Sequence, residues 1–344
     1  MKQRRLLERK WLFVGCLAGM IAVLTGLAAA DGNRPVRLAY RGAVYEAPLV
    51  AALRQDFFKA EGLRVELVKT DWQHFTPGSA ARWDGMTADY RTFALIQRGL
   101  RVKLVAGLHG NCVCVATKPD SKITSLRDLK GKIVGVANPG DGPSVVLSRL
   151  FRDLPGDPGL KTTWKPIPVP LQRAALTEGK IAAAAAWEGR TESKTPACAG
   201  RVIFMSARDR AFLEKNSAFP HFYGSFIALG AGLIRNEPPK AAAVARAWLR
   251  AAQWVGEHPA ATARLIREQS GAIPAPDLER QLKDYLWMPG VAYARENIRW
   301  YIREQKELGI LNPCPDPERF FKEVYAPIIP DLKQEAPSCS MEGT

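Results

Sequence analysis

Strand-like runs and helical stretches alternate along residues 36–205, and this alternation constrains the fold more than any other feature of the sequence. The strand-like runs are short, at 36–40, 64–68, 102–108, 113–118, 133–137, 182–187 and 201–205. Stretches with apolar residues at helical spacing lie between them, at 49–61, 79–86, 92–98, 143–153 and 171–179. Such alternation indicates βαβ units and therefore parallel sheets covered by helices.

The C-terminal third has a different secondary-structure pattern, because it is predicted to be almost entirely helical. After a strand-like run at 226–234, helical patterns occupy 239–257, 259–269, 276–286, 292–308 and 316–325. The last segment, 331–344, is polar and poor in apolar residues, so we expect a flexible tail there. The sequence thus predicts an α/β protein with two α/β units and a helical C-terminal cover.

The first thirty residues have the three parts of a secretory signal peptide. Five basic residues lie among the first ten, an apolar run spans residues 11–30, and Ala28-Ala29-Ala30 offers a small-residue cleavage site. The run has about the ~20 residues of a membrane span, so an uncleaved N-terminal anchor is the alternative. No second apolar stretch reaches that length, and we expect the mature chain to be soluble in the periplasm or another extracytoplasmic space.

An exported chain meets an oxidising compartment, which changes what its cysteines can do. Cleavage after Ala30 leaves an odd number of cysteines, so at least one has no partner within the chain. Their pairing is not fixed by sequence, although a bond between the two that lie two residues apart on one strand face would be strained. The mature chain would carry Cys112, Cys114, Cys198, Cys314 and Cys339.

Several function classes are excluded by what the sequence lacks. It contains no G-x-x-x-x-G-K-[ST], H-E-x-x-H or G-x-S-x-G motif, and no G-x-G-x-x-G between a strand and a helix. We therefore expect no cofactor. The formal net charge is +15, but Lys and Arg are scattered over helix surfaces, which argues against a nucleic-acid partner.

The densest group of potential metal ligands is the segment His109-Gly110-Asn111-Cys112-Val113-Cys114. One imidazole and two thiols form a soft set that would suit copper or zinc, so a metal site at His109, Cys112 and Cys114 is one hypothesis. A closed site needs a further ligand at recognisable spacing, and none is nearby. The favoured interpretation is a histidine at a strand end beside two small buried thiols.

The segment 123–136 reads I-T-S-L-R-D-L-K-G-K-I-V-G-V. It resembles the I-x-S-x-x-D-L-K-G-K-x-V-G-V segment of the solute-binding proteins of ABC importers, in the nitrate, sulfonate, taurine and pyrimidine-precursor group. Further stretches agree in the same order: F-F-K-A-E-G-L at 57–63, G-M-T-A-D at 85–89, 99–107, and 176–187. The similarity covers about residues 35–270.

This resemblance implies a two-lobed periplasmic binding protein type II fold, with doubly wound sheets and a helical C-terminal cover. Lobe I would hold residues 33–117 and 226–330, and lobe II residues 118–225. A small polar organic solute would bind in the cleft between them. The protein would be a monomer that delivers this solute to the permease of a membrane transporter, whose separate ATPase subunits drive release.

The same geometry places candidate ligand-binding residues in the loops that follow the strands of each lobe. Lobe I offers Arg41, Tyr45, Asp71, Trp72, Asp89, Tyr90, His109, Asn111 and Cys112. Lobe II offers Asp141, Ser144, Trp187 and Glu188.

The charge of the ligand stays open at this stage. Relatives that bind oxyanions have small hydroxyl residues at a helix N-terminus, where this chain has Asp141 and Pro143. Several acids near the cleft favour a cationic, zwitterionic or nitrogen-heterocyclic ligand, whereas Arg41 could hold a carboxylate or sulfonate. Trp72, Tyr90 and Trp187 could enclose a planar or cationic group.

An enzyme of the same fold is the remaining alternative. Fungal pyrimidine synthases of the thiamine pathway share the architecture and carry a clustered cysteine run. This chain has only Cys112 and Cys114 in the corresponding role. We therefore expect a binding protein that catalyses no reaction.

Overall fold

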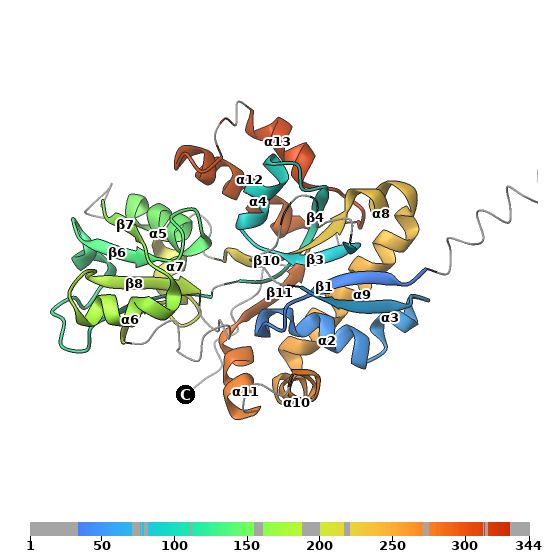
Figure 1. Ribbon diagram of the computed structural model, residues 1–344, viewed down its shortest axis with the longest axis horizontal. Coiled ribbons are helices and arrows are strands. Elements are labelled where there is room, and N and C mark those ends of the chain that lie inside the picture. Colours follow the sequence, from blue (N-terminus) through green and yellow to red (C-terminus); the bar gives the residue numbers. More distant parts are fainter. Residues whose placement is uncertain are drawn as a thin grey trace, which may run out of the picture.

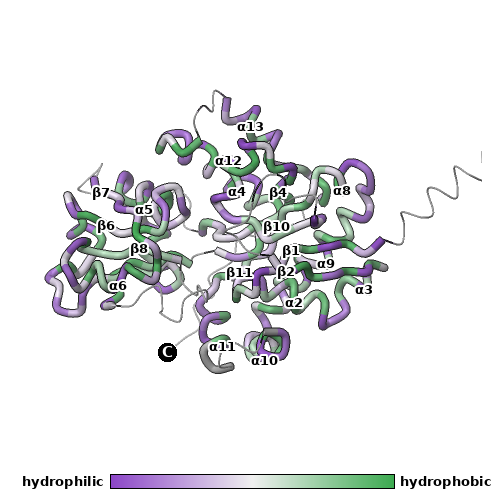
Figure 2. The backbone as a smooth tube through the Cα atoms, in the orientation of Figure 1, coloured by the Kyte–Doolittle hydropathy of each residue, from purple (hydrophilic) through white to green (hydrophobic). Residues whose placement is uncertain are grey.

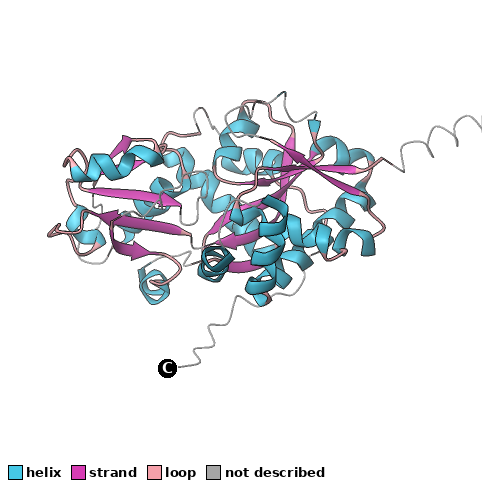
Figure 3. Cartoon of the chain, turned by 60° about the horizontal axis from the view of Figure 1, so that its bottom comes forward, coloured by secondary structure: helices cyan, strands magenta, loops and turns pink. Residues whose placement is uncertain are grey.

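The computed structural model describes residues 34–70, 76, 78, 82–110, 112–154, 161–187, 200–216, 221–270, 275–311, 313 and 316–330. Two sheets with helices on their faces form the molecule (Figure 1, Figure 3). The predicted signal peptide and the predicted tail lie outside the described residues. Among those that are described, no helix has both the length and the apolar character needed to cross a bilayer.

The six-stranded sheet has the order β11-β4-β10-β3-β1-β2. Its strands are β1 (Val36–Tyr40), β2 (Val65–Lys69), β3 (Gly85–Ala88), β4 (Val102–Gly110), β10 (Tyr223–Gly230) and β11 (Leu286–Gly290). β1 pairs in parallel with β2 and β3, whereas β10 pairs antiparallel with β3 and β4. The sheet is therefore mixed, and the prediction of parallel sheets is correct for only one half of it.

The five-stranded sheet has the order β7-β6-β8-β5-β9. Its strands are β5 (Val113–Thr117), β6 (Ile133–Val136), β7 (Thr163–Pro166), β8 (Ala183–Trp187) and β9 (Arg201–Met205). β6 is parallel to β7 and β8, and β5 is antiparallel to β8 and β9. Antiparallel pairs occur in both sheets because the chain enters or leaves each sheet through β4, β5, β9 and β10.

The chain thus crosses between the sheets twice. The first crossing joins β4 to β5 through residues 111–112 alone, and the second leads from β9 through α7 (Arg210–Asn216) to β10. The strand Val113–Thr117, which the sequence assigned to lobe I, belongs to the five-stranded sheet. The boundary at residue 117 comes from the family resemblance, whereas the pairing of β5 with β8 and β9 shows that the chain leaves the six-stranded sheet after Gly110.

Helices cover both faces of the six-stranded sheet. One face carries η1 (Val44–Glu46), α2 (Ala47–Arg54), α3 (Phe57–Ala60), α8 (Ala231–Asn236), α9 (Pro238–Glu257), α10 (Pro259–Ser270) and α11 (Ala275–Asp284). The other carries α4 (Arg91–Gln97), α12 (Ala292–Glu307) and α13 (Pro317–Val324). In the helix layer that contains α9, the alanine-rich α9 packs through its fully buried Trp248. Apolar residues concentrate at the strands, and polar residues are frequent on the outer helices (Figure 2).

The five-stranded sheet is flanked by η4 (Leu126–Leu129), α5 (Gly142–Asp153), α6 (Val169–Thr177) and α7. Helix α5 also contacts α12 of the other unit. Arg149 and Arg152 of α5 both bind the Glu304 carboxylate of α12, which is almost completely buried. These ion pairs link the two sheet units outside the chain crossings.

Two elements differ from the sequence-based expectation. Gly85 and Met86, predicted within a helix, begin β3, where a glycine fits between the close side chains of Leu38 and Leu229. The strand β11 was not predicted, because its five residues follow directly on α11. Pro289 is compatible with it since β11 is an edge strand, where a missing N–H breaks no ladder.

Gly110 at the end of β4 is a point where no larger residue fits. A Cβ there would lie 2.0 Å from the Phe222 carbonyl oxygen and 2.5 Å from the Met288 methyl carbon. We expect Gly110→Ala to lower the free energy of unfolding by about 2–3 kcal/mol, because the backbone of Phe222 must move. Urea unfolding followed by tryptophan fluorescence measures this. Gly232→Ala is the matched control, since nothing lies within 4 Å of its Cβ position; equal effects of the two substitutions would contradict the expectation.

Candidate functional site

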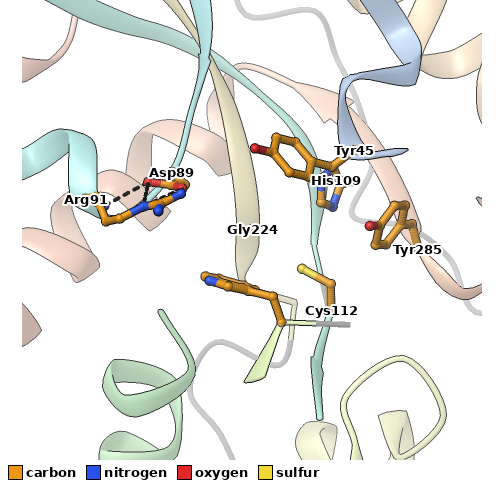
Figure 4. Close-up of a pocket in the computed structure, with 8 residues that line it drawn as sticks. Tyr45, Asp89, Arg91, His109, Cys112, Gly224 and Tyr285 are labelled. Carbon is orange, nitrogen blue, oxygen red and sulfur yellow. Dashed lines mark hydrogen bonds and ion pairs between the residues drawn. The ribbon is translucent and has the colours of Figure 1, made fainter. Parts of the chain in front are cut away.

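A cavity lies where the two sheet units meet, and both units contribute to its wall. Figure 4 shows the Asp89–Arg91 pair on one side of Gly224, and Tyr45, His109 and Tyr285 on the other. The lining residues are Tyr45, Asp89, Arg91, His109, Cys112, Trp187, Gly224 and Tyr285.

Tyr45 is positioned by a buried carboxylate beneath the loop after β1. The Glu46 side chain is fully buried and accepts hydrogen bonds from the Arg41 backbone N–H (2.8 Å) and the Ala43 N–H (3.3 Å). It also pairs with the Arg41 guanidinium at 2.7 Å. Burial opposes the charged form of Arg41, but Glu46 reverses this and raises the pKa of Arg41 above its usual value. Arg41, expected to contact ligand, is therefore engaged within the loop and does not line the cavity.

Asp89 and Arg91 lie where β3 passes into α4. The Arg91 guanidinium binds the Asp89 carboxylate with Nε 3.0 Å and Nη2 2.5 Å from Oδ2. Burial favours the neutral acid, but Arg91 and Arg41 more than compensate and lower the pKa of Asp89. The cavity wall thus presents one cation and one anion that neutralise each other.

His109 occupies the opposite wall among aromatic rings. Its imidazole stacks on Tyr285 at a centroid distance of 4.5 Å and meets the edge of Trp287 at 5.3 Å. The residue is 2% exposed, and this burial lowers the pKa of His109 to about 3. Within the described part of the chain, neither ring nitrogen has a hydrogen-bond partner. A neutral imidazole without a partner therefore borders the cavity.

Cys112 and Gly224 line the cavity close to the two chain crossings, Cys112 between β4 and β5 and Gly224 near the start of β10. A Cβ on Gly224 would lie 2.5 Å from the Cys112 sulfur, 3.4 Å from the His109 ring and 3.5 Å from the Trp187 ring. The missing side chain is therefore what allows these three groups to approach one another. Cys112 itself is a buried thiol.

Trp187 is the contribution of the five-stranded sheet. It ends β8, stacks on Tyr90 at 5.1 Å, and donates its indole N–H to the Asp141 carboxylate at 3.0 Å. Asp141 caps α5, and the Ser144 hydroxyl donates back to the Asp141 carbonyl at 2.7 Å. Tyr90, Asp141 and Ser144 thus support the wall from behind and do not line it.

The sequence-derived set divides into three groups. Tyr45, Asp89, His109, Cys112 and Trp187 line the cavity, and Arg41, Tyr90, Asp141 and Ser144 do not. Asp71, Trp72, Asn111 and Glu188 lie outside the described residues. Arg91, Gly224 and Tyr285 were missed. Arg91 could have been found as the cation two residues after the G-x-x-D acid, whereas nothing local marks Tyr285, which reaches the site through the unpredicted pairing of β11 with β4.

The hypothesis of a metal site at His109, Cys112 and Cys114 is contradicted by the state of Cys114. This residue is disulfide-bonded, so it has no thiolate to offer. In the described ranges, no group of three or more His, Cys, Asp or Glu side chains could hold a metal ion.

Comparisons with known proteins agree on one group. The family described as NMT1/THI5 like matches residues 43–262. No curated protein matches the chain. Among solved structures, the periplasmic aliphatic sulphonate binding protein SsuA from Escherichia coli is 15% identical with a TM-score of 0.62, over 90% of this chain and 97% of that one. The periplasmic nitrate-binding protein NrtA from Synechocystis PCC 6803 is 13% identical with a TM-score of 0.56, over 85% of this chain and 86% of that one.

A third similar structure comes from another import system. The ligand-binding component of an ABC-type import system from Staphylococcus aureus, with zinc bound, is 14% identical with a TM-score of 0.59, over 86% of this chain and 97% of that one. At sequence identities of 13–15%, these similarities show a shared fold and nothing more specific. The two-lobed type II periplasmic binding protein fold expected from the sequence is thereby confirmed.

Proposed function

The chain belongs to the NMT1/THI5-like family, and from this premise we propose that it is the solute-binding component of an ABC importer. It captures a small polar organic solute and delivers it to a membrane permease. The structural relatives support this, since their names describe ABC import components and binding proteins for sulfonate or nitrate.

The observation that carries the proposal is the composition of the cavity wall. His109 and Gly224 belong to the six-stranded sheet, Trp187 to the five-stranded sheet, and Cys112 to the segment that connects β4 with β5. A solute in this cavity contacts both sheet units at once. Binding therefore favours the arrangement in which the units are closed around it, which is the hinge closure that a permease can recognise.

The domain assignment follows the two sheets. We assign lobe I to residues 34–110 and 223–330 and lobe II to residues 113–222, which moves the first boundary to the end of β4 and the second to the start of β10. The exported location is supported by the N-terminal sequence pattern and by the disulfide at Cys114, because disulfides persist in oxidising compartments. The chain acts as a monomer, without a cofactor and without catalysis, beside separate permease and ATPase subunits.

The proposal predicts one solute per chain, released unchanged. Native mass spectrometry of the purified mature protein, followed by denaturation, detects a co-purified organic mass and tests whether the same mass is recovered. Small-angle X-ray scattering before and after its removal should show a larger radius of gyration for the empty protein. Recovery of a product that differs from the added solute would contradict the proposal.

Trp187→Ala sharpens this experiment. Removing the aromatic wall that lobe II contributes is expected to weaken solute binding by about tenfold to a hundredfold, since aromatic contacts dominate such sites. Trp254→Ala is the matched control, because that indole stacks on His258 away from the cavity. Equal affinities of the two variants would show that the solute binds elsewhere.

A further inference from the structure

We infer that His109 is the specificity-determining residue of the cavity, and that it selects an uncharged, flat solute with a hydrogen-bonding group such as a carboxamide over an anion. This inference rests on the proposed function, because it names the class of solute that the same cavity takes. Three observations carry it independently of any ligand: the unpartnered imidazole, the cancelled charges and the aromatic walls.

The imidazole is the strongest of these observations. His109 is 2% exposed and lines the cavity, yet neither Nδ1 nor Nε2 has a hydrogen-bond partner among the residues that the structure describes. A buried polar group left without a partner costs about 1–3 kcal/mol, so such groups are nearly always satisfied by protein, water or ligand. A neutral imidazole has one N–H donor and one lone-pair acceptor. These two groups point in diverging directions, so either nitrogen can bind one polar group of an uncharged solute, and burial keeps the imidazole itself uncharged.

The positive charges around the cavity are already paired with carboxylates, so they offer an anion little stabilisation. The Arg91 guanidinium is already bound to the Asp89 carboxylate through two nitrogens. Behind the wall, Arg41 pairs with Glu46, and the Asp141 carboxylate accepts the Trp187 N–H. A sulfonate or nitrate would have to compete with Asp89 for Arg91 and would meet that carboxylate at close range. An uncharged solute meets neither cost.

The aromatic rings in the cavity wall determine which shape of solute fits best. Tyr45, Tyr285 and Trp187 contribute rings, and Tyr285 already stacks on His109. Aromatic rings favour flat partners through offset stacking and large contact areas.

The test uses three probes with the full mature chain: benzamide, benzenesulfonate and nitrate, each at up to 10 mM. Benzamide and benzenesulfonate share a ring and differ in charge. We expect benzamide to raise the melting temperature by about 2–5 °C at ten times its Kd, and to shift the ring ¹⁵N signals of His109. We expect no comparable effect from either anion.

Variants separate recognition from folding. His109→Phe retains the stacking on Tyr285 and should weaken benzamide binding about tenfold to a hundredfold, as expected for a lost buried hydrogen-bonding group. His109→Gln keeps a donor and an acceptor and should recover part of the affinity. His258→Phe, at an exposed position, is the matched control.

The inference and the proposed function fail by different results. If benzenesulfonate or nitrate stabilises the protein as much as benzamide does, the cavity selects anions, and the inference is overturned while the proposed carrier function stands. If no probe at 10 mM changes the melting temperature or the His109 signals, the inference is also overturned. The proposed function is contradicted only by the mass spectrometry experiment, when no unchanged solute is recovered from the chain.

Discussion

Replacing Glu46 by alanine is expected to lower the free energy of unfolding by about 3–5 kcal/mol, because it leaves the Arg41 guanidinium buried without its counter-charge. The Arg41 side chain is 3% exposed and the Glu46 side chain 0%. Glu46 also receives the N–H groups of Arg41 and Ala43, so the substitution leaves two backbone donors to find other acceptors. Chemical denaturation at neutral pH measures the loss.

A double variant without either charge separates the effect of the unpaired charge from the loss of packing. Arg41→Met combined with Glu46→Leu should cost much less than Glu46→Ala alone, because it removes both charges and fills the space. Glu66→Ala, at an exposed position of β2 in the same sheet, is the matched control and should change stability by less than about 0.5 kcal/mol. If Glu46→Ala and Glu66→Ala have the same effect, the ion pair does not hold the loop that carries Tyr45.

The second large effect is a pH dependence that comes from His109. Its pKa is lowered from 6.5 to about 3 by burial. Below pH 6.5 His109 is protonated in the unfolded chain, whereas in the folded chain it stays neutral down to about pH 3. Acidification between these two values therefore favours unfolding. The contribution has a limiting slope of about 1.4 kcal/mol per pH unit, and between pH 6.5 and 4.5 it amounts to about 2 kcal/mol.

Comparing the unfolding free energies of wild type and His109→Phe over this range isolates the contribution. The variant should lose less stability on acidification than wild type, by about 2 kcal/mol at pH 4.5. His258→Phe serves as the control, because that imidazole is exposed at the end of α9. Parallel pH curves for wild type and His109→Phe would mean that His109 accepts a proton in the folded state, which would also weaken the argument for an uncharged solute.

Much of the architecture could be predicted because it is encoded locally. The period of apolar residues identifies β1, β4, β6 and most helices, and the Pro residues at the start of α9 and α10 mark where those helices begin. What could not be predicted depends on partners distant in sequence. The antiparallel placement of β10 between β3 and β4, and the existence of β11, result from pairings between strands more than a hundred residues apart.

The site shows the same division. Asp89 could be proposed only from the G-x-x-D step of the family resemblance. His109 and Trp187 could be proposed because each follows or ends a buried strand, and such positions gather at one edge of a sheet. Arg41 has the same position in sequence, yet Glu46, five residues later, engages it. Only tertiary packing distinguishes a polar side chain that faces the cavity from one that supports its wall.

The brevity of the connection between β4 and β5 has a consequence for how a bound molecule is sensed. The first of the two crossings consists of residues 111–112 alone, and His109 and Cys112, which line the cavity, lie within or next to it. If the proposed solute binds there, it contacts the same short segment about which the two units would rotate, so binding would act on the hinge directly and no relay through the protein interior would be needed.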